Sequence, residues 1–122
     1  MREHKYRGKR RDNGEWAYGY LFKSWERCYI LWGTTNRVPD MVEVDPETVG
    51  ECTNLTDKNS KEIYEGDILY DSGEYYSPVI WSKEYAGWFI QTYDGPEPLY
   101  EQGNVIIIGN IYDNPELLKE GD

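Results

Sequence analysis

The chain has 122 residues, a length that suggests one domain or a small domain with an appended segment. Its mean hydropathy is −0.84, yet it contains 5 Trp, 12 Tyr and 2 Phe. Side chains this bulky argue against a disordered chain. The longest aliphatic run, Val105 to Ile108, is far shorter than the roughly 20 residues of a membrane-spanning helix, so we expect no membrane association.

The formal net charge of −10 is unevenly distributed along the chain. Residues 1–37 contain nine Lys and Arg against four Asp and Glu, a net charge of +5. Residues 38–122 contain four against nineteen, a net charge of −15. Such asymmetry can indicate a segment that binds a polyanion. We favour pairing of the basic segment with the acidic remainder, in the same chain or a neighbouring one, because the acidic body repels phosphates within a Debye length of roughly 8–10 Å.

Cys28 and Cys52 are the only cysteines, and they do not form a Cys-x-x-Cys pair. The first residues have no apolar segment of the kind found in a secretory signal. We therefore expect a cytoplasmic protein in which both cysteines are reduced thiols and act as small buried hydrophobic residues.

Short β-rich runs separated by turn residues dominate the sequence, and no stretch has a convincing helical period of apolar residues. In chain order, strands are expected at residues 16–22, 27–32, 41–44, 61–70, 78–81, 87–92 and 104–112. The first two are expected to form a hairpin. Chain breaks are expected at Pro39–Asp40 and a loop at Asp94–Pro98. Asn114 as N-cap and Pro115 at the first helical position predict a short closing helix over residues 114–118.

The predicted fold class is therefore mainly β. Residues 51–122 are expected to form a small β-barrel or sandwich with the closing helix, because their strands recur at turn spacings of about 8–12 residues. Residues 1–50 are expected to form a separate N-terminal β-hairpin layer.

Few residues have the spacing that catalysis or metal binding needs. Glu65 and Asp67 are two carboxylates on the same face of an extended strand, but no His or third acidic residue completes a metal shell. We favour a turn in which Asp67 accepts hydrogen bonds from local backbone N–H groups. His4 is the only histidine and lies in a basic terminus, where no group orients it as a base. We expect neither an enzyme nor a bound cofactor or metal.

The run Arg7-Gly8-Lys9-Arg10-Arg11 is a candidate polyanion-binding segment, with Arg7, Lys9, Arg10 and Arg11 as the contacting residues. The alternatives are a strand edge protected by charged side chains, or pairing with the acidic body. Trp16, Tyr18 and Tyr20 are candidate aromatic contacts that could stack on bases. We favour packing or subunit contact for these rings, because Trp and Tyr at strand spacing are common in small β cores and at interfaces.

Several blocks of sequence, read in order, resemble the YopX family, small proteins of phages, prophages and other mobile elements. They are Arg7-Gly8-Lys9 with Asn13-Gly14-Glu15-Trp16 and Tyr18-Gly19; Pro46-Glu47-Thr48-Val49-Gly50; Asp57-Lys58-Asn59; Ile63-Tyr64-Glu65-Gly66-Asp67-Ile68; and Ile108-Gly109-Asn110-Ile111-Tyr112 with Asn114-Pro115-Glu116-Leu117. The resemblance implies a barrel of the Src-homology-3 (SH3) type in the C-terminal part, and it implies no biochemical activity.

The sequence departs from the family pattern at three positions. Cys52 stands where an aromatic residue is usual, and Asn54 and Ser60 stand where glycine is usual. Asn tolerates the left-handed conformation, so position 54 is a mild change, whereas Ser60 makes a tight hairpin less certain.

These observations lead to one favoured function and two alternatives. The favoured function is a non-enzymatic interaction or assembly module, homo-oligomeric, that acts through a β-barrel surface and the basic N-terminal segment. The first alternative is a nucleic-acid-binding accessory factor. The second is an acidic mimic of DNA that binds a host protein.

Overall fold

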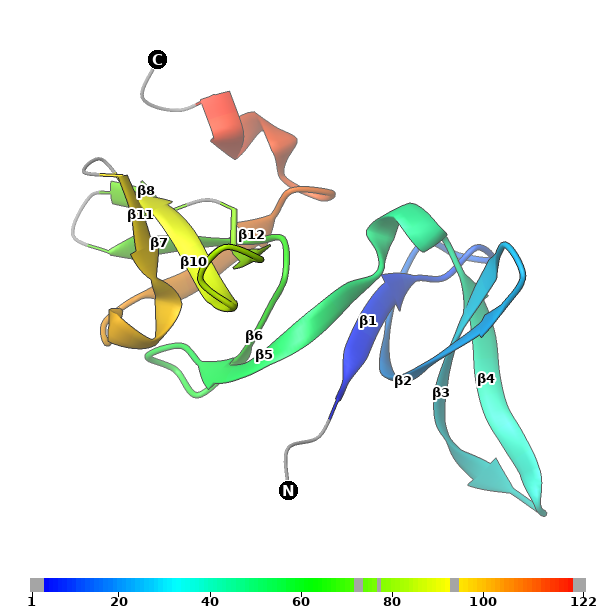
Figure 1. Cartoon of the computed structure of the whole chain (residues 1–122). Helices are drawn as coiled ribbons and strands as arrows, with labels where there is room; N and C mark the ends of the chain where they lie inside the picture. The colour runs from blue at the N-terminus through cyan, green and yellow to red at the C-terminus, as the bar shows by residue number, and fades with distance from the viewer. Residues whose placement is uncertain (1–3, 72–73, 77, 93–94, 120–122) are drawn as a thin grey trace. The chain divides into compact units, whose positions relative to one another are not determined.

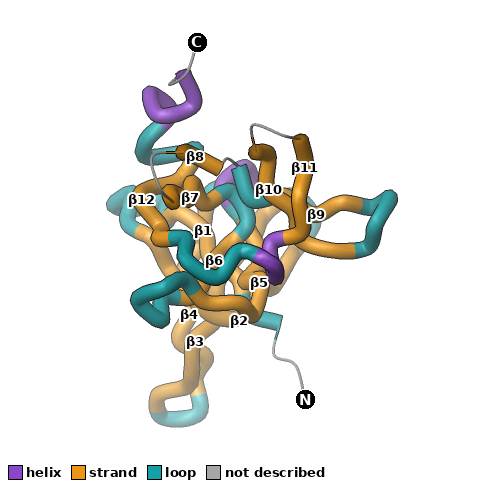
Figure 2. Tube along the Cα trace, turned by 90° about the vertical axis from the view of Figure 1, so that its left-hand side faces the viewer, coloured by secondary structure: helices purple, strands orange, loops and turns teal. Residues whose placement is uncertain are grey.

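The computed structural model describes residues 4–71, 74–76, 78–92 and 95–119 (Figure 1). The chain divides into two compact units, residues 1–52 (unit 1) and 53–122 (unit 2). Strands make up most of the described trace, and the helical segments within it are short 3₁₀ turns (Figure 2). The fold is therefore mainly β, as predicted. None of the described helical segments has the length and apolar character to cross a bilayer.

Unit 1 is an antiparallel sheet with the strand order β4-β3-β2-β1-β5. The expected hairpin is confirmed, and its two strands pair from Tyr20 opposite Leu31 to Ser24 opposite Arg27. A 3₁₀ turn, η1, precedes β5, and β5 continues into unit 2, where β6 (Glu62–Tyr64) lies beside it. The elements of unit 1 are β1 (Tyr6–Lys9), β2 (Trp16–Ser24), β3 (Arg27–Thr35), β4 (Val38–Val44), η1 (Pro46–Thr48) and β5 (Gly50–Thr56).

Strand β1 is a finding that the sequence pattern did not predict. It lies between β2 and β5, with Tyr6 opposite both Gly19 and Glu51. The Cys52 backbone N–H extends this pairing by donating to the Lys5 carbonyl oxygen at 2.7 Å. The basic segment is therefore neither a loose terminus nor a sheet edge along Tyr6–Lys9. Its four residues were too few to show a period-two pattern.

Strand β2 changes partner at Gly19. Residues before this point pair with β1, and residues after it pair with β3. Gly19 has a φ of +156°, and a Cβ built there would lie 2.3 Å from the Leu31 carbonyl oxygen. Only glycine allows the two backbones to approach this closely.

The hydrophobic core cluster of unit 1 consists of small or aliphatic side chains. Ala17, Cys28, Ile30 and Val44 form the cluster, and Tyr6, Leu21, Val42 and Val49 pack around it. Two backbone hydrogen bonds join the ends of β1 and β4, since Asp45 N–H donates to Lys9 and Arg11 N–H donates to Glu43. These bonds bring the ends of β1 and β4 together beside the cluster, in which no aromatic residue is fully buried.

Unit 2 contains two three-stranded antiparallel sheets, with the orders β12-β7-β8 and β11-β10-β9. Its core is aliphatic and comprises Ile63, Leu69, Val79, Ile90, Leu99 and Val105. The further elements are β7 (Asp67–Asp71), β8 (Glu74–Tyr76), β9 (Ile80–Ser82), β10 (Gly87–Thr92), β11 (Gly95–Pro98), η2 (Leu99–Glu101), β12 (Ile106–Asn110) and η3 (Pro115–Lys119).

Three expectations about these regions are not confirmed. The described strands of unit 2 form no closed barrel. The expected closing helix is instead the 3₁₀ turn η3, and the side chain of Asn114, the expected N-cap, accepts a hydrogen bond from the Asn110 N–H at 3.2 Å in the turn after β12. Two proline-containing segments expected as breaks or loops lie in strands, Pro39 in β4 and Gly95–Pro98 as β11.

The Asp57 side chain links the turn before β6 to strand β12 through hydrogen bonds. Its buried carboxylate accepts hydrogen bonds from the backbone N–H groups of Asn59, Lys61 and Ile107 at 2.8, 2.9 and 3.0 Å. Burial raises the pKa of the Asp57 carboxyl, but the three N–H donors together outweigh it, so the pKa lies below its ordinary value.

Replacing Gly19 with alanine tests the bend of β2. We expect Gly19→Ala to lower the free energy of unfolding by about 2–3 kcal/mol, because the new Cβ meets a backbone carbonyl that cannot move alone. Gly33→Ala is the control, since its Cβ would have no neighbour nearer than 3.9 Å, and we expect a change within about 0.5 kcal/mol. Urea unfolding measures both, and equal losses would contradict the account.

The Asp57 carboxylate predicts a pH dependence of stability. A folded-state pKa below the unfolded value of about 3.9 means that the ionised group stabilises the fold above that pH. This stabilisation is lost as the pH falls through the folded-state pKa. We expect Asp57→Asn to be less stable at neutral pH by about 2 kcal/mol and to lose less stability on acidification than the unmodified chain. Thermal unfolding across pH tests this, with Glu84→Gln on an exposed turn as control. Parallel curves for the two chains would contradict it.

Candidate functional site: an aromatic face on the β2–β3 hairpin

Aromatic side chains line one face of strand β2. Tyr18, Tyr20 and Phe22 are 49%, 52% and 52% exposed. The alternate residues Ala17 and Leu21 belong to the core cluster of unit 1. This alternation follows from the two-residue period of a strand, which directs successive side chains to opposite faces.

Pairing with β1 and β3 extends this face across three strands. Residues directly opposite each other in antiparallel strands share a face, and the register places Arg7 beside Tyr18, Lys9 beside Trp16, Tyr29 beside Phe22 and Leu31 beside Tyr20. We call this set the outer face: Arg7, Lys9, Trp16, Tyr18, Tyr20, Phe22, Tyr29 and Leu31.

The two cations of the outer face are packed on one indole ring. The Arg7 guanidinium carbon lies 4.5 Å from the centroid of the Trp16 ring, and the Lys9 Nζ lies 5.4 Å from it. Arg7 is only 6% exposed. Both distances are in the range of cation–π attraction, so these cations help to position Trp16 at one end of the aromatic row.

The other two predicted cations lie after β1 and have acidic neighbours. Arg10 makes a two-point contact with Asp12, from Nε at 2.9 Å and from an Nη at 2.8 Å. This hydrogen bonding lowers the pKa of the Asp12 carboxyl. Arg11 Nε lies 3.3 Å from a Glu43 carboxylate oxygen. The structure therefore brings Arg7 and Lys9 together, but it does not bring Arg10 and Arg11 to the same ring.

The formal charges of the two units differ from those of the two sequence segments compared above, residues 1–37 and 38–122. Unit 1 contains nine Lys and Arg and nine Asp and Glu, so its formal charge is zero. Unit 2 contains four and fourteen, a formal charge of −10. The basic segment is thus balanced by acidic residues of its own unit, Glu43 among them.

Phe22 and Tyr29 are members of the face that the sequence analysis did not name. Their ring centroids are 6.1 Å apart and the rings are tilted by 48°. The signal for Phe22 was present, because the alternation that includes Trp16, Tyr18 and Tyr20 reaches it at the same spacing. Tyr29 could be found only from the register of the hairpin.

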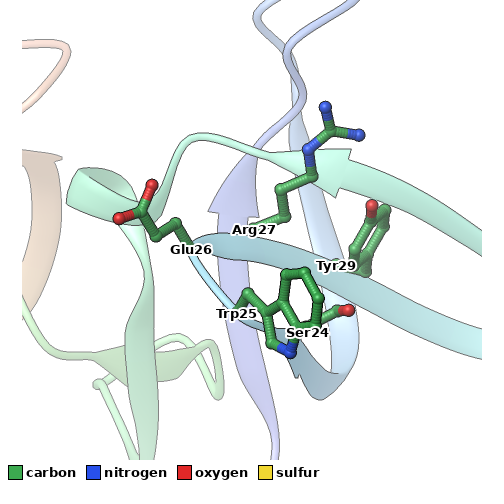
Figure 3. A pocket seen from close by; sticks show the side chains of 5 residues that line it. All are labelled: Ser24, Trp25, Glu26, Arg27 and Tyr29. Carbon is green, nitrogen blue, oxygen red and sulfur yellow. The ribbon is translucent and has the colours of Figure 1, made fainter.

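The tip of the hairpin (residues 23–27) carries a further exposed aromatic ring. Trp25 is 99% exposed. Together with Ser24, Glu26, Arg27 and Tyr29 it lines a hollow of about 580 Å³ (Figure 3). Hydrogen bonding to Tyr29 and the nearby Glu43 carboxylate raise the pKa of Arg27, which keeps it charged.

The structure places the residues considered for catalysis in separate local surroundings. The buried Asp67 carboxylate accepts a hydrogen bond from the Tyr64 N–H at 2.8 Å, as expected for a turn. His4 lies on the surface, with its Nδ1 3.3 Å from Glu51. Cys28 and Cys52 are buried thiols. Within the described part of the chain, no three His, Cys, Asp or Glu side chains gather closely enough to hold a metal ion.

Some of the sequence blocks that carry the family resemblance form or adjoin turns in the structure. In the block that contains Asp57, the carboxylate of this residue accepts a hydrogen bond from the Ile107 N–H of β12. In the last block, the Asn110 side-chain oxygen accepts hydrogen bonds from the N–H groups of Tyr112 and Asp113 at 3.0 and 2.9 Å. Asn54 and Ser60, which replace the usual glycines, have φ angles of +65° and +66°. The backbone at these two positions therefore has the left-handed geometry that glycine adopts most easily.

Comparison with known proteins agrees with this pattern. The family model described as YopX protein matches residues 5–119, nearly the whole chain. The search of curated proteins found no match. The order of the turn-forming blocks and the extent of the model match lead to one conclusion: the chain belongs to the YopX family.

Proposed function

We propose that the chain is a non-catalytic interaction module that binds a protein partner through the outer face of unit 1. One observation carries the proposal: Tyr18, Tyr20 and Phe22 stand half-exposed in a row on a sheet whose other face contributes Ala17, Cys28, Ile30 and Val44 to the core cluster. Self-association belongs to this proposal, as do a mobile-element origin, a cytoplasmic location and an SH3-type arrangement of unit 2.

The size of the aromatic row supports this role. A large aromatic side chain presents about 150–250 Å² when fully exposed, so three half-exposed rings present roughly 300 Å². Tyr29, Leu31 and the exposed Met41 of β4 lie on the same face by register and enlarge it. Contiguous apolar patches of roughly 300–600 Å² on a monomer are often functional. Tyr and Trp are also the residues most enriched at interface centres.

The contacts of three of the four candidate polyanion-binding residues favour a protein partner over a nucleic acid. Phosphate binding needs Lys and Arg side chains that release counterions on contact. Arg7 is buried on Trp16, Arg10 is bonded to Asp12, and Arg11 lies beside Glu43. Base stacking on Tyr18 and Tyr20 remains the alternative, and labelled oligonucleotides at low salt would reveal it.

A second candidate function follows from the charge of unit 2. A formal charge of −10 on 70 residues, against zero on unit 1, concentrates the acidity in one compact unit. Such a surface suits the basic cleft of a DNA-binding protein. Binding of this kind would depend steeply on salt, whereas binding through the outer face would depend on the rings.

The first prediction for the outer face concerns stability. We expect Tyr20→Ser to change the free energy of unfolding by less than about 1 kcal/mol, because the ring is half-exposed and not part of the core. Ile30→Ala, on the neighbouring strand and 0% exposed, should lose about 2–5 kcal/mol. Urea unfolding of the two variants tests whether the rings stabilise the fold. Comparable losses of stability in Tyr20→Ser and Ile30→Ala would show that the exposed rings stabilise the fold and would contradict this prediction.

The second prediction concerns partner capture. The immobilised full chain should retain a discrete protein from an extract of the cells in which it is made, after nuclease treatment. The double variant Tyr20→Ser, Phe22→Ser should retain at least tenfold less, because the centre of an interface contributes most of its affinity. Tyr100→Ser removes a ring that is 74% exposed in unit 2 and should retain the normal amount. Equal retention by all three chains, or material that nuclease removes, would contradict the proposal.

A further inference from the structure

The turn between β1 and β2 contains Asn13 followed by Gly14, the only Asn-Gly pair in the sequence. Both residues are exposed. The backbone nitrogen of the residue after an asparagine can attack the side-chain amide carbon and form a five-membered ring, and a side chain on that residue hinders the approach. Gly14 has no side chain, and a Cβ built there would meet no heavy atom within 4 Å. The path of attack is therefore open.

Two contacts of Asn13 prepare its side-chain amide for this attack. The Glu15 N–H donates to the Asn13 Oδ1 at 2.9 Å. Attack at Cγ moves an electron pair onto this oxygen, and a donor already in place stabilises the developing negative charge. The Asn13 Nδ2 donates to a Glu15 carboxylate oxygen at 3.4 Å. A group that can relay a proton therefore lies beside the nitrogen that leaves as ammonia.

One contact holds the attacking nitrogen back. The Gly14 N–H donates to the Arg10 carbonyl oxygen at 2.9 Å, and this bond must break before the nitrogen can reach Cγ. Exposed turns open locally at a small cost in free energy. The contacts between Asn13 and Glu15 involve neither group of that bond, so they can persist while it opens. The turn therefore slows the reaction but does not prevent it.

We propose that Asn13 is a site of spontaneous deamidation, with water as the only co-reactant. The Gly14 nitrogen loses its proton to solvent base and forms a bond to the Asn13 Cγ, while the Cγ–Nδ2 bond breaks and ammonia leaves. Water then opens the resulting succinimide ring. Cleavage of the new bond from nitrogen to Cγ gives aspartate. Cleavage of the original peptide bond gives isoaspartate, whose main chain runs through the former side chain. Either product adds one negative charge.

The products alter the turn that ends the pairing of β1 and β2 at Lys9 and Trp16. The Arg10 N–H closes this turn by donating to the Glu15 carbonyl oxygen at 2.8 Å. Isoaspartate lengthens the main chain between these residues by one methylene group and places a second carboxylate near that of Glu15. We therefore expect it to loosen the end of the outer face where Trp16 lies. This consequence for binding rests on the proposed function, whereas the chemistry at Asn13 does not.

Peptide mapping by mass spectrometry of the full chain, incubated at neutral and mildly alkaline pH, tests the proposal. We expect both products at Asn13 well before any product at the exposed Asn36 and Asn59. The rate should rise with pH, because the Gly14 nitrogen must lose its proton. Gly14→Ala should slow the reaction at least tenfold, because its Cβ crowds the attacking nitrogen. Gly103→Ala is the matched control: its Cβ also meets nothing within 4 Å, no asparagine precedes it, and the rate at Asn13 should be unchanged.

Asn13→Gln is a second variant, because alanine at position 14 is strained by the φ of +76° there. Glutamine keeps an amide but needs a six-membered ring, so this position should stay unmodified while the natural chain reacts. The separated isoaspartate form should unfold at lower urea concentration than Asn13→Gln. An incubated chain without product at Asn13, earlier modification of Asn36 or Asn59, an unchanged rate in Gly14→Ala, or equal urea midpoints would overturn the proposal. Fresh Asn13→Gln should capture the partner normally, so absence of capture by every chain would contradict the proposed function alone.

Discussion

The two-residue period of strand β2 is the constraint on which the candidate interface depends. One face must be small and apolar to close over Ile30 and Val44, and Ala17 and Leu21 satisfy this requirement. The other face is not part of the core cluster, and half-exposed aromatic residues occupy it at Tyr18, Tyr20 and Phe22. Because a one-residue slip would exchange the two faces, the same core contacts that fix the register also fix which rings meet solvent. The alternation of side chains along β2 thus determines both the core contacts of unit 1 and the rings on its outer face.

Unit 2 follows a different principle, in which polar turn residues satisfy backbone groups. Asp57 accepts hydrogen bonds from the N–H groups of Asn59, Lys61 and Ile107, Asp67 accepts from that of Tyr64, and Asn110 accepts from those of Tyr112 and Asp113. Buried donors without acceptors would be costly, so these side chains stabilise the chain reversals between short strands. Family membership is carried largely by such blocks. Family membership therefore bears on the fold of the chain, whereas the proposed function is argued from the exposed rings of unit 1.

How far the sequence predicted the structure depended on the range of the interactions. The hairpin of β2 and β3, the mainly β class and the turn at Asp67 were predictable, because alternation and turn residues are local signals. Strand β1 was missed because its four residues pair with partners distant in sequence. Trp16, Tyr18 and Tyr20 lie on one strand, as their alternation predicted, but their exposure was not predictable. The pairing of Arg10 and Arg11 with acidic side chains likewise needed coordinates.

The central claim is that the rings of the outer face serve contact with another protein and not the stability of the chain. Hydroxyl-radical footprinting of Tyr18, Tyr20 and Phe22, in the purified chain and in a nuclease-treated extract of the cells that make it, tests this most directly. The account predicts strong labelling of all three rings in the purified chain and protection in the extract, with Tyr100 labelled equally in both. Rings already protected in the dilute purified chain, or labelled to the same extent in the extract, would contradict it.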